Sequence, residues 1–345
     1  MNALPGNVDN FESINAADWS KLLNSYRTPS NFRAGFELFV TLVLYVVFWA
    51  VMYAALQVSY FLSLLISLPA AGMLMRIFMI QHDCGHGSFS GSKFINNWLG
   101  RFLGILTFTP FDYWQRNHAL HHASSGSLNH RGIGDINTLT VAEYESRTYI
   151  GRLLYRIYRN PLVLFLVGPA YVFLLEQRLP VGMMKMGWRP WVSAMGTNIG
   201  IICLTTFMIW LIGWQSFLMI QLPVTLLAAT MGVWLFFVQH QFEETSWDSD
   251  PDWDRRESAL HGSSHYDLPQ PLRWVTGNIG IHHVHHLCSH IPFYRLSEVL
   301  RDFPQLHDVG RITLLESFKC ANLALWDTES RRLLTFQEAL VKVND

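Results

Sequence analysis

The sequence contains few charged residues and few cysteines. Only 15% of its 345 residues are charged, against about a quarter in ordinary soluble domains. The formal net charge is -1, so the chain lacks the basic excess of a nucleic-acid-binding protein. The four cysteines, Cys84, Cys203, Cys288 and Cys320, form no CxxC pair, which argues against a disulfide framework or a thiolate zinc site.

The chain is instead rich in apolar residues, which make up half of it. A membrane-spanning helix needs about 20 such residues. Gly35 to Ile80 therefore holds two spans, and Ala194 to Val238 holds two more. We expect an all-α polytopic membrane protein with four transmembrane helices, near 36–56, 59–80, 194–213 and 217–238.

The remaining segments are assigned around these spans. The first 20 residues lack the basic and apolar regions of a cleaved signal peptide, so we expect none, and 1–35 is predicted to be a cytoplasmic N-terminal arm. Residues 36–345 form one domain with cytoplasmic catalytic segments 81–193 and 239–345. The short apolar stretches 98–111 and 161–175 are predicted to be interfacial or re-entrant, because Gly168-Pro169 interrupts the second.

Histidine is the most informative residue type. Of 15 histidines, nine lie in three five-residue windows that read HDCGH (82–86), HALHH (118–122) and HHVHH (282–286). Spacings of three and four residues place imidazoles on one face of a helix, and imidazole suits iron, zinc and copper. Eight convergent imidazoles are too many for one ion, so the pattern predicts a two-metal centre.

The order of spans and boxes tests this hypothesis. The first box follows the second span, and two further spans return the chain to the same side before the third box. All three boxes therefore face one compartment. Lys and Arg are concentrated on that side, so the positive-inside rule makes it cytoplasmic. We predict a cytoplasmic helical cap that carries the metal site.

At these boxes the chain resembles the membrane fatty acid desaturases, and most of all their acyl-lipid, delta-12/omega-6-like branch. The resemblance extends from about residue 30 to residue 300. Its motifs are HDCGHGSF (82–89), YWQRNHALHH (113–122), GDINTLTVAEY (134–144), VQHQFEET (238–245) and NIGIHHVHHL (278–287).

The resemblance implies nine ligands to two irons: His82, His86, His118, His121, His122, His240, His282, His285 and His286. His283 lies about 100° around a helix from His282 and should point away from the metals. Cys84 is expected to be a small buried residue. The remaining histidines are expected to be structural or superficial: His130, His261, His265, His290 and His307.

Metal-bound imidazoles usually donate their second N–H to a carboxylate or carbonyl. The polar candidates for contact with the ligands or their water are Asp83, Asp112, Asp135, Glu243, Glu244 and Asn278. The acidic run 243–257 is expected to be an exposed loop. The tail after His286 is expected to form a few amphipathic helices.

The implied activity is an O2-dependent oxidoreductase that inserts a cis double bond into an acyl chain, with delta-12 desaturation of a lipid-bound oleoyl group as the expected reaction. The two electrons are expected from ferredoxin or cytochrome b5, and the location is a multi-pass protein of a bacterial inner membrane. Desaturation at delta-5, delta-9 or omega-3 and a histidine-box hydroxylase or ketolase remain alternatives. A metal transporter would place its ligands at the membrane midplane, and a zinc hydrolase would have a carboxylate beside them, as in HExxH.

Overall fold

The computed structural model describes residues 15–132 and 134–344, and most of these residues are helical. The N-terminal arm is described only from Asn15 onward, where it forms α1 (Ala16–Leu22) and η2 (Leu23–Tyr26). The predictions for residues 1–14 lie outside the described residues.

Four helices are long and apolar enough to cross a membrane, as predicted. They are α2 (Asn31–Leu56), α3 (Tyr60–His86), α9 (Trp188–Ile212) and α10 (Trp214–His240). Their bounds differ from the predicted spans by up to six residues: α2 and α9 begin earlier, and α3 continues past residue 80 to the first histidine box. This helix ends only where Gly87 adopts a left-handed conformation, with a φ of 71°, which glycine takes without steric cost.

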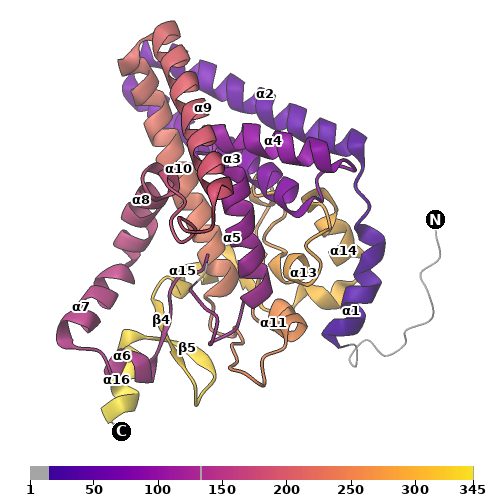
Figure 1. Ribbon diagram of the computed structural model, residues 1–345, viewed down its shortest axis with the longest axis vertical. Helices are drawn as coiled ribbons and strands as arrows, with labels where there is room; N and C mark the ends of the chain where they lie inside the picture. The colour runs from indigo at the N-terminus through magenta and orange to yellow at the C-terminus, as the bar shows by residue number, and fades with distance from the viewer. Residues whose placement is uncertain (1–14, 133, 345) are drawn as a thin grey trace.

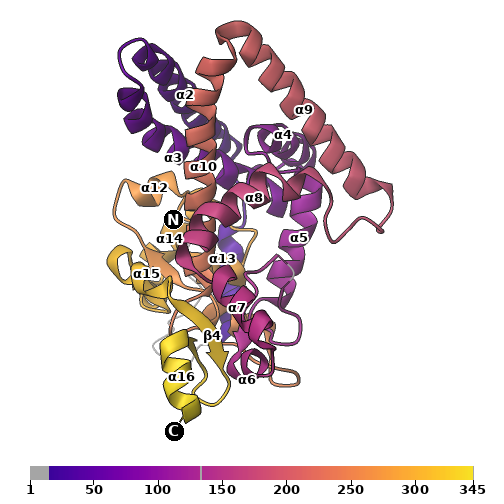
Figure 2. The same ribbon diagram turned by 90° about the vertical axis from the view of Figure 1, so that its left-hand side faces the viewer.

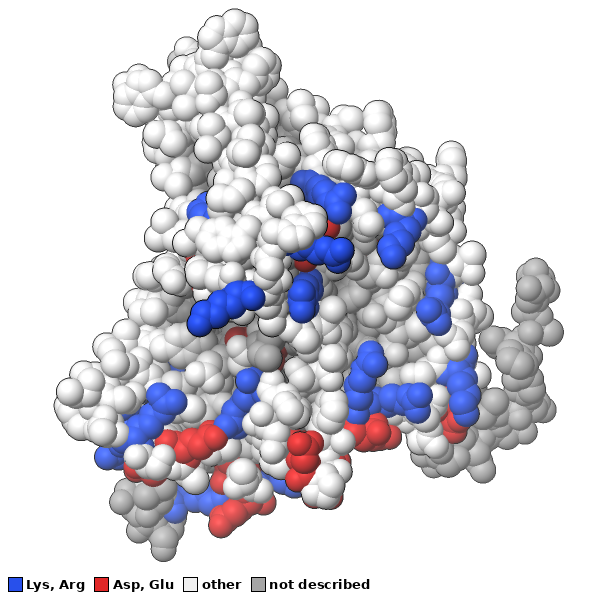
Figure 3. All heavy atoms as spheres, viewed as in Figure 1, with Lys and Arg blue, Asp and Glu red and all other residues white. Residues whose placement is uncertain are grey.

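The two helical hairpins turn at the same end of the molecule. In Figures 1 and 2 the α2–α3 and α9–α10 turns lie at the top, while the C-terminal strands and α16 lie at the bottom. Figure 2 shows α9 inclined away from α10, and the most apolar window of α9 is only 6% buried. Figure 3 shows Lys, Arg, Asp and Glu over the middle and lower parts of one face, and none at its top. The exposed apolar helices therefore suit contact with lipid.

The two stretches predicted to be interfacial are short helices. The first corresponds to α4 (Lys93–Leu106). The second contains η3 (Val163–Val167), α8 (Gly168–Leu174) and η4 (Glu176–Arg178), after α7 (Tyr149–Tyr158) and a bend of 59°. Because His122 before this segment and His240 after it belong to one site, the chain between them crosses a membrane an even number of times. Helices α9 and α10 supply both crossings, so the bent segment does not span.

The lower part of the molecule combines short helices with two small sheets. Its helices are α5 (Phe111–Ser124), α6 (Val141–Glu145), α11 (Arg255–His261), α12 (Leu272–Val275), α13 (His282–Leu287), η5 (Phe293–Arg295), α14 (Leu296–Asp302), η6 (Pro304–His307), α15 (Leu314–Cys320) and α16 (Phe336–Asn344). Strands β1 (Leu139–Thr140), β4 (Leu323–Asp327) and β5 (Arg332–Thr335) form one sheet in that order, and β2 (His265–Asp267) pairs in parallel with β3 (Arg311–Thr313). The prediction of helices alone for the tail missed these strands. All five residues of β4 are buried, so it lacks the alternating pattern that marks a half-buried strand.

A buried ion pair ties the spans to the C-terminal part of the chain. Glu37 on α2 pairs with Arg76 on α3, and both side chains are 2% exposed. Arg76 also donates to the backbone carbonyl of Trp274, with its guanidinium 4.0 Å from the centre of that indole ring. An isolated charge is costly away from water, so Arg76 keeps its contacts with both Glu37 and Trp274. These contacts hold α12, and with it the segment that leads to the third box, against α3.

Candidate metal centre

The predicted ligand histidines come from four helices that meet at one end of the spans. His82 and His86 lie on the last turns of α3, and His240 is the last residue of α10. Helix α5 carries the second box and α13 carries the third. Gly85 allows α5 to approach, because a Cβ there would lie 2.8 Å from the Trp114 ring.

The nine predicted ligands form two separate groups. The first group contains five histidines: His82, His86, His118, His122 and His285. The second contains four: His121, His240, His282 and His286. Helices α5 and α13 contribute to both, and the His122 and His286 rings stack between the groups at 4.0 Å.

The Nε2 atoms of the five-histidine group converge on one point. The Nε2 of His118 lies 3.0 Å from that of His82, 2.9 Å from that of His86 and 3.1 Å from that of His122. One imidazole nitrogen carries at most one proton, so these three short distances are not three hydrogen bonds. They match ligands around one ion, because bonds of about 2.1 Å at right angles separate two nitrogens by about 3.0 Å.

The four-histidine group has the same geometry. The Nε2 of His240 lies 3.1 Å from that of His121 and 3.0 Å from that of His282. The Nε2 atoms of His121 and His286 are 3.3 Å apart. No carboxylate belongs to either group among the described residues. These nitrogen-only donor sets fit two ions of the iron, zinc or copper type.

Burial keeps five of these imidazoles, on α5 and α13, in the form that binds a metal. It lowers the pKa of His118 and His122 on α5 well below the usual value, and the neighbouring imidazoles lower it further. The same two causes, in the same order, lower the pKa of His282, His285 and His286 on α13. The rings are therefore neutral near pH 7, and a neutral imidazole nitrogen offers its lone pair to a metal.

Two of the predicted polar residues contact ligand histidines. Asp135 pairs with Nδ1 of His121. Asp83 lies 3.3 Å from Nδ1 of His82 and accepts a 2.6 Å hydrogen bond from the backbone N–H of Phe293. Such carboxylates fix the tautomer and ring orientation of a ligand.

The structure does not bring the other four polar candidates to a ligand. Asp112 forms an ion pair with Arg101 at 2.8 Å. Glu243 is exposed beside Arg332, and Glu244 is also exposed. Asn278 donates to the Phe293 carbonyl at 3.1 Å. Local acidity in the sequence indicated these residues, but the direction of each element turns them elsewhere.

The remaining histidines lie outside both groups. His283 is buried on α13 but points away from the metals, with its Nε2 2.8 Å from the Leu306 carbonyl. His265, Asp267 and His307 form a third set of possible donors. The Asp267 carboxylate already pairs with the guanidinium groups of Arg273 and Arg311. We therefore assign this set a structural role. The other three are exposed: His130, His261 and His290.

Two aromatic residues next to the ligands were not predicted. Trp114 stacks on His118 with ring centres 4.7 Å apart, and Phe236 contacts both His121 and His240. Each precedes a ligand on the same helix by four residues, a spacing that could have identified them. Their rings cover the imidazoles on the side of an apolar cavity.

That cavity has a volume of about 710 Å³ and reaches His82, His118 and His282. One part of its wall is formed by Met75 and Phe78 on α3 and by Ala228 and Gly232 on α10. Another part is formed by η3, α8 and η4, where Val167 and Tyr171 are exposed on the surface. The cavity therefore connects the surface of the bent segment with both histidine groups.

Comparisons with known proteins agree with this geometry. The model of the "Fatty acid desaturase" family matches residues 59–313. A fatty acid desaturase of Bacillus subtilis is 40% identical over 320 residues, covering 92% of this chain and 90% of the relative. Two proteins of Synechocystis are more distant. An sn-1 acyl-lipid omega-3 desaturase (ferredoxin) is 28% identical over 70% of this chain and 67% of its own. An sn-1 oleoyl-lipid 12-desaturase is 24% identical over 65% of this chain and 63% of its own.

Proposed function

The chain belongs to the fatty acid desaturase family, and we propose that it inserts a cis double bond into the acyl chain of a membrane lipid, using O2 and two electrons from an external donor. The observation that carries this proposal is the apolar cavity of about 710 Å³ that reaches the histidine groups. An enzyme acting on a polar substrate would place more polar groups in a pocket of this size.

The cavity has a direction. Its wall includes the exposed residues Val167 and Tyr171 and the buried residues Thr225 and Ala228. Burying a polar head group without partners is costly, so the head group stays at the exposed mouth and the methyl end enters the buried arm. Trp114 and Phe236 exclude water from the carbons that pass the metals.

The nine histidines are proposed to hold two irons. Side-chain acids and bases do not remove hydrogen from an unactivated methylene, so the reaction requires a cofactor. Two bound irons would supply an oxidant derived from O2 that removes two hydrogens from neighbouring carbons. Asp83 and Asp135 orient ligand imidazoles, and the cavity holds one carbon pair beside the centre.

Two positions of the double bond are supported by different observations. The sequence resemblance and the oleoyl-lipid 12-desaturase of Synechocystis favour delta-12. The depth of the buried arm favours a position nearer the carboxyl end, such as delta-5. Thr225 precedes His240 by 15 residues on α10, which is about 22 Å of helix, and a delta-12 substrate has only a short methyl segment beyond the reacting carbons.

The membrane orientation and the electron donor are also proposals. The concentration of Lys and Arg on the side of the histidine boxes supports a cytoplasmic site, in the inner membrane of a bacterium. Three relatives carry ferredoxin in their names, which supports ferredoxin as the donor, with cytochrome b5 as the alternative.

The test is expression in a bacterial host that makes no polyunsaturated lipids, followed by fatty-acid profiling with double-bond location. We expect a new cis double bond, and its position decides between delta-12, delta-5, delta-9 and omega-3. Hydroxylated or keto products would contradict the desaturase assignment while leaving the metal centre in place. Elemental analysis of anaerobically purified protein should give two irons per chain, and one iron would contradict the two-metal centre.

A further inference from the structure

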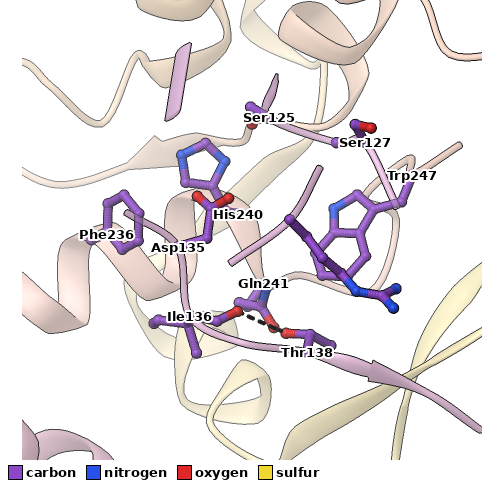
Figure 4. A pocket seen from close by; sticks show the side chains of 11 residues that line it. Ser125, Ser127, Asp135, Ile136, Thr138, Phe236, His240, Gln241 and Trp247 are labelled. Atoms are coloured by element: carbon purple, nitrogen blue, oxygen red, sulfur yellow. Dashed lines mark hydrogen bonds between the residues drawn. The ribbon is translucent and has the colours of Figure 1, made fainter. Parts of the chain in front are cut away.

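A second, small cavity also reaches the four-histidine group, at His240, and several polar side chains stand in its wall. It has a volume of about 30 Å³, and its wall includes Ser127, Arg131, Asp135, His240 and Gln241. Figure 4 shows the His240 ring and the Asp135 carboxylate together on one side of it, with Trp247 opposite and Gln241 bonded to Thr138 below.

Two polar atoms of this wall are buried without a partner among the described residues. They are Oγ of Ser127 and Nη1 of Arg131. An unsatisfied buried donor or acceptor costs about 1–3 kcal/mol. A water needs about 10–15 Å³ of such space and two to four polar partners. The cavity has the volume and the polar side chains to hold one or two waters.

The position of the cavity connects the metal centre with the surface. Asp135, Ile136 and Phe236 line both this cavity and the large apolar one. On the outer side, the second guanidinium nitrogen of Arg131 pairs with Glu143, whose side chain is 43% exposed. Water in the cavity therefore lies between a ligand histidine and a surface ion pair.

The chemistry of desaturation gives such a cavity a task, and this step rests on the proposed function. One O2, two electrons from the donor, two protons and two hydrogens from the acyl chain give one double bond and two waters. Each turnover therefore takes up two protons and releases two waters at a site whose large cavity is filled by hydrocarbon. Although Asn117, Glu176 and Gln177 also line the large cavity, a bound acyl chain occupies it and blocks that path to water and protons.

We propose that the polar cavity of Ser127 and Arg131 is the route by which protons reach the metal centre and product water leaves it. The Ser127 hydroxyl and the Arg131 guanidinium hold the water in place. Phe236 and Ile136 separate this wet cavity from the acyl chain. Protons pass along the ordered water from the surface beside Glu143.

The experiment compares two variants of equal size at one position. Ser127→Val removes the hydroxyl, whereas Ser127→Thr gives a side chain of the same shape that keeps it, so the two variants differ only in the hydrogen-bonding group. Ser124→Val is the control for the segment, because Ser124 lies outside the cavity and bonds to the Leu120 carbonyl. Iron content and the KM for lipid should match the wild type in all three, which shows that they fold.

We expect Ser127→Val to lower turnover by about tenfold. This is less than the roughly 100-fold or more that a group transferring the proton itself contributes, because Ser127 holds the water and does not transfer the proton. The variant should also release more hydrogen peroxide per double bond and show a larger solvent deuterium isotope effect. Ser127→Thr and Ser124→Val should stay within about twofold of the wild type. Equal behaviour of the Val and Thr variants at position 127 would overturn the proposal.

A readout without turnover completes the test. A structure at a resolution that shows ordered water should contain density within hydrogen-bond distance of Ser127 Oγ and Arg131 Nη1, and Ser127→Val should remove it. An empty cavity in the wild type would overturn the proposal. If the wild type made no double bond in any lipid, the proposed function would fail by a separate observation.

Discussion

The buried arm of the apolar cavity can be shortened by one substitution, Gly232→Leu on α10. A Cβ at position 232 would lie 3.6 Å from Sδ of Met75, an ordinary contact, so the backbone accepts a side chain and the rest of the leucine enters the cavity. Gly232 precedes His240 by eight residues, about 12 Å of helix. The variant therefore limits the methyl-side segment of the substrate to about 12 Å.

The magnitude follows from the length of the acyl chain. An extended chain advances about 1.3 Å per carbon, from bonds of about 1.5 Å at near-tetrahedral angles. A delta-5 reaction on an 18-carbon chain leaves about twelve carbons, or about 16 Å, beyond the reacting pair. The leucine then excludes about three methylenes at about 0.8 kcal/mol each, which lowers kcat/KM by about 60-fold. For a 16-carbon chain about one methylene is excluded, and the loss is about fourfold.

The assay is competition between lipids with 16-carbon and 18-carbon chains in one vesicle preparation, with product ratios as the measure of relative kcat/KM. We expect Gly232→Leu to shift this ratio toward the shorter chain by about 15-fold. Ala228→Leu is the matched control. It lies 12 residues from His240, about 18 Å, beyond the methyl end of either chain, and should leave the ratio within about twofold.

Unchanged selectivity in Gly232→Leu would refute the reasoning from cavity depth. It would mean that the methyl segment is short, as in delta-12 desaturation, or does not enter this arm. Equal losses for both chain lengths would also count against it, because exclusion of methylenes must depend on chain length.

Three further predictions concern the ligands, the buried ion pair and one histidine outside the metal centre. His282→Ala should lower product formation at least about 100-fold and reduce bound iron. His283→Ala removes a hydrogen bond to the Leu306 carbonyl, so this variant should keep its iron and most of its activity and be about 1 kcal/mol less stable. The reverse order would make His283 the ligand in place of His282. Glu37→Gln should destabilise the protein by about 3–5 kcal/mol in thermal unfolding, because it leaves the Arg76 charge buried without its partner. Adding Arg76→Met should recover part of this loss, and no recovery would argue against the unpaired charge as its cause. Burial lowers the pKa of His265 to about 4, whereas a histidine in the unfolded chain has a pKa of about 6.5. As the pH falls below about 6.5, the unfolded chain therefore binds this proton before the folded protein does. The free energy of unfolding is highest above that pH and decreases by about 3 kcal/mol down to pH 4. His265→Gln should therefore lose less stability over that pH range, and an identical pH dependence of unfolding in the variant would exclude His265 as a source.

The sequence predicted the four spans because each depends only on a local run of apolar residues long enough to cross a bilayer. Its errors concern the ends of those helices. The second helix continues through His82 to His86, although hydrophobicity falls at residue 80, because helical backbone bonding needs no apolar side chains and continues until Gly87. The strands β4 and β5 were missed because pairing between segments, and not alternation within one, forms them.

Eight of the nine proposed ligand histidines were indicated by spacings of three and four residues, which are a property of a single helix, and His240 was indicated by the family resemblance. Their division between two groups was not. His121 and His122 are neighbours in the sequence but join different groups, because they point about 100° apart around α5 and different helices face each of them. Nor did the sequence distinguish Asp135 from Asp112. Asp135 pairs with the proposed ligand His121, whereas Asp112 pairs with Arg101.

The sequence by itself thus determined which residues are available: four apolar helices set by composition and eight imidazoles set by spacing along single segments, with His240 added by the family resemblance. The tertiary structure alone decided what those residues surround. The depth of the arm beside Gly232 and the unpaired Ser127 and Arg131 beside His240 arise where α3, α5, α8 and α10 meet. Such spaces depend on distances between segments far apart in the chain, and no local pattern of residues encodes those distances.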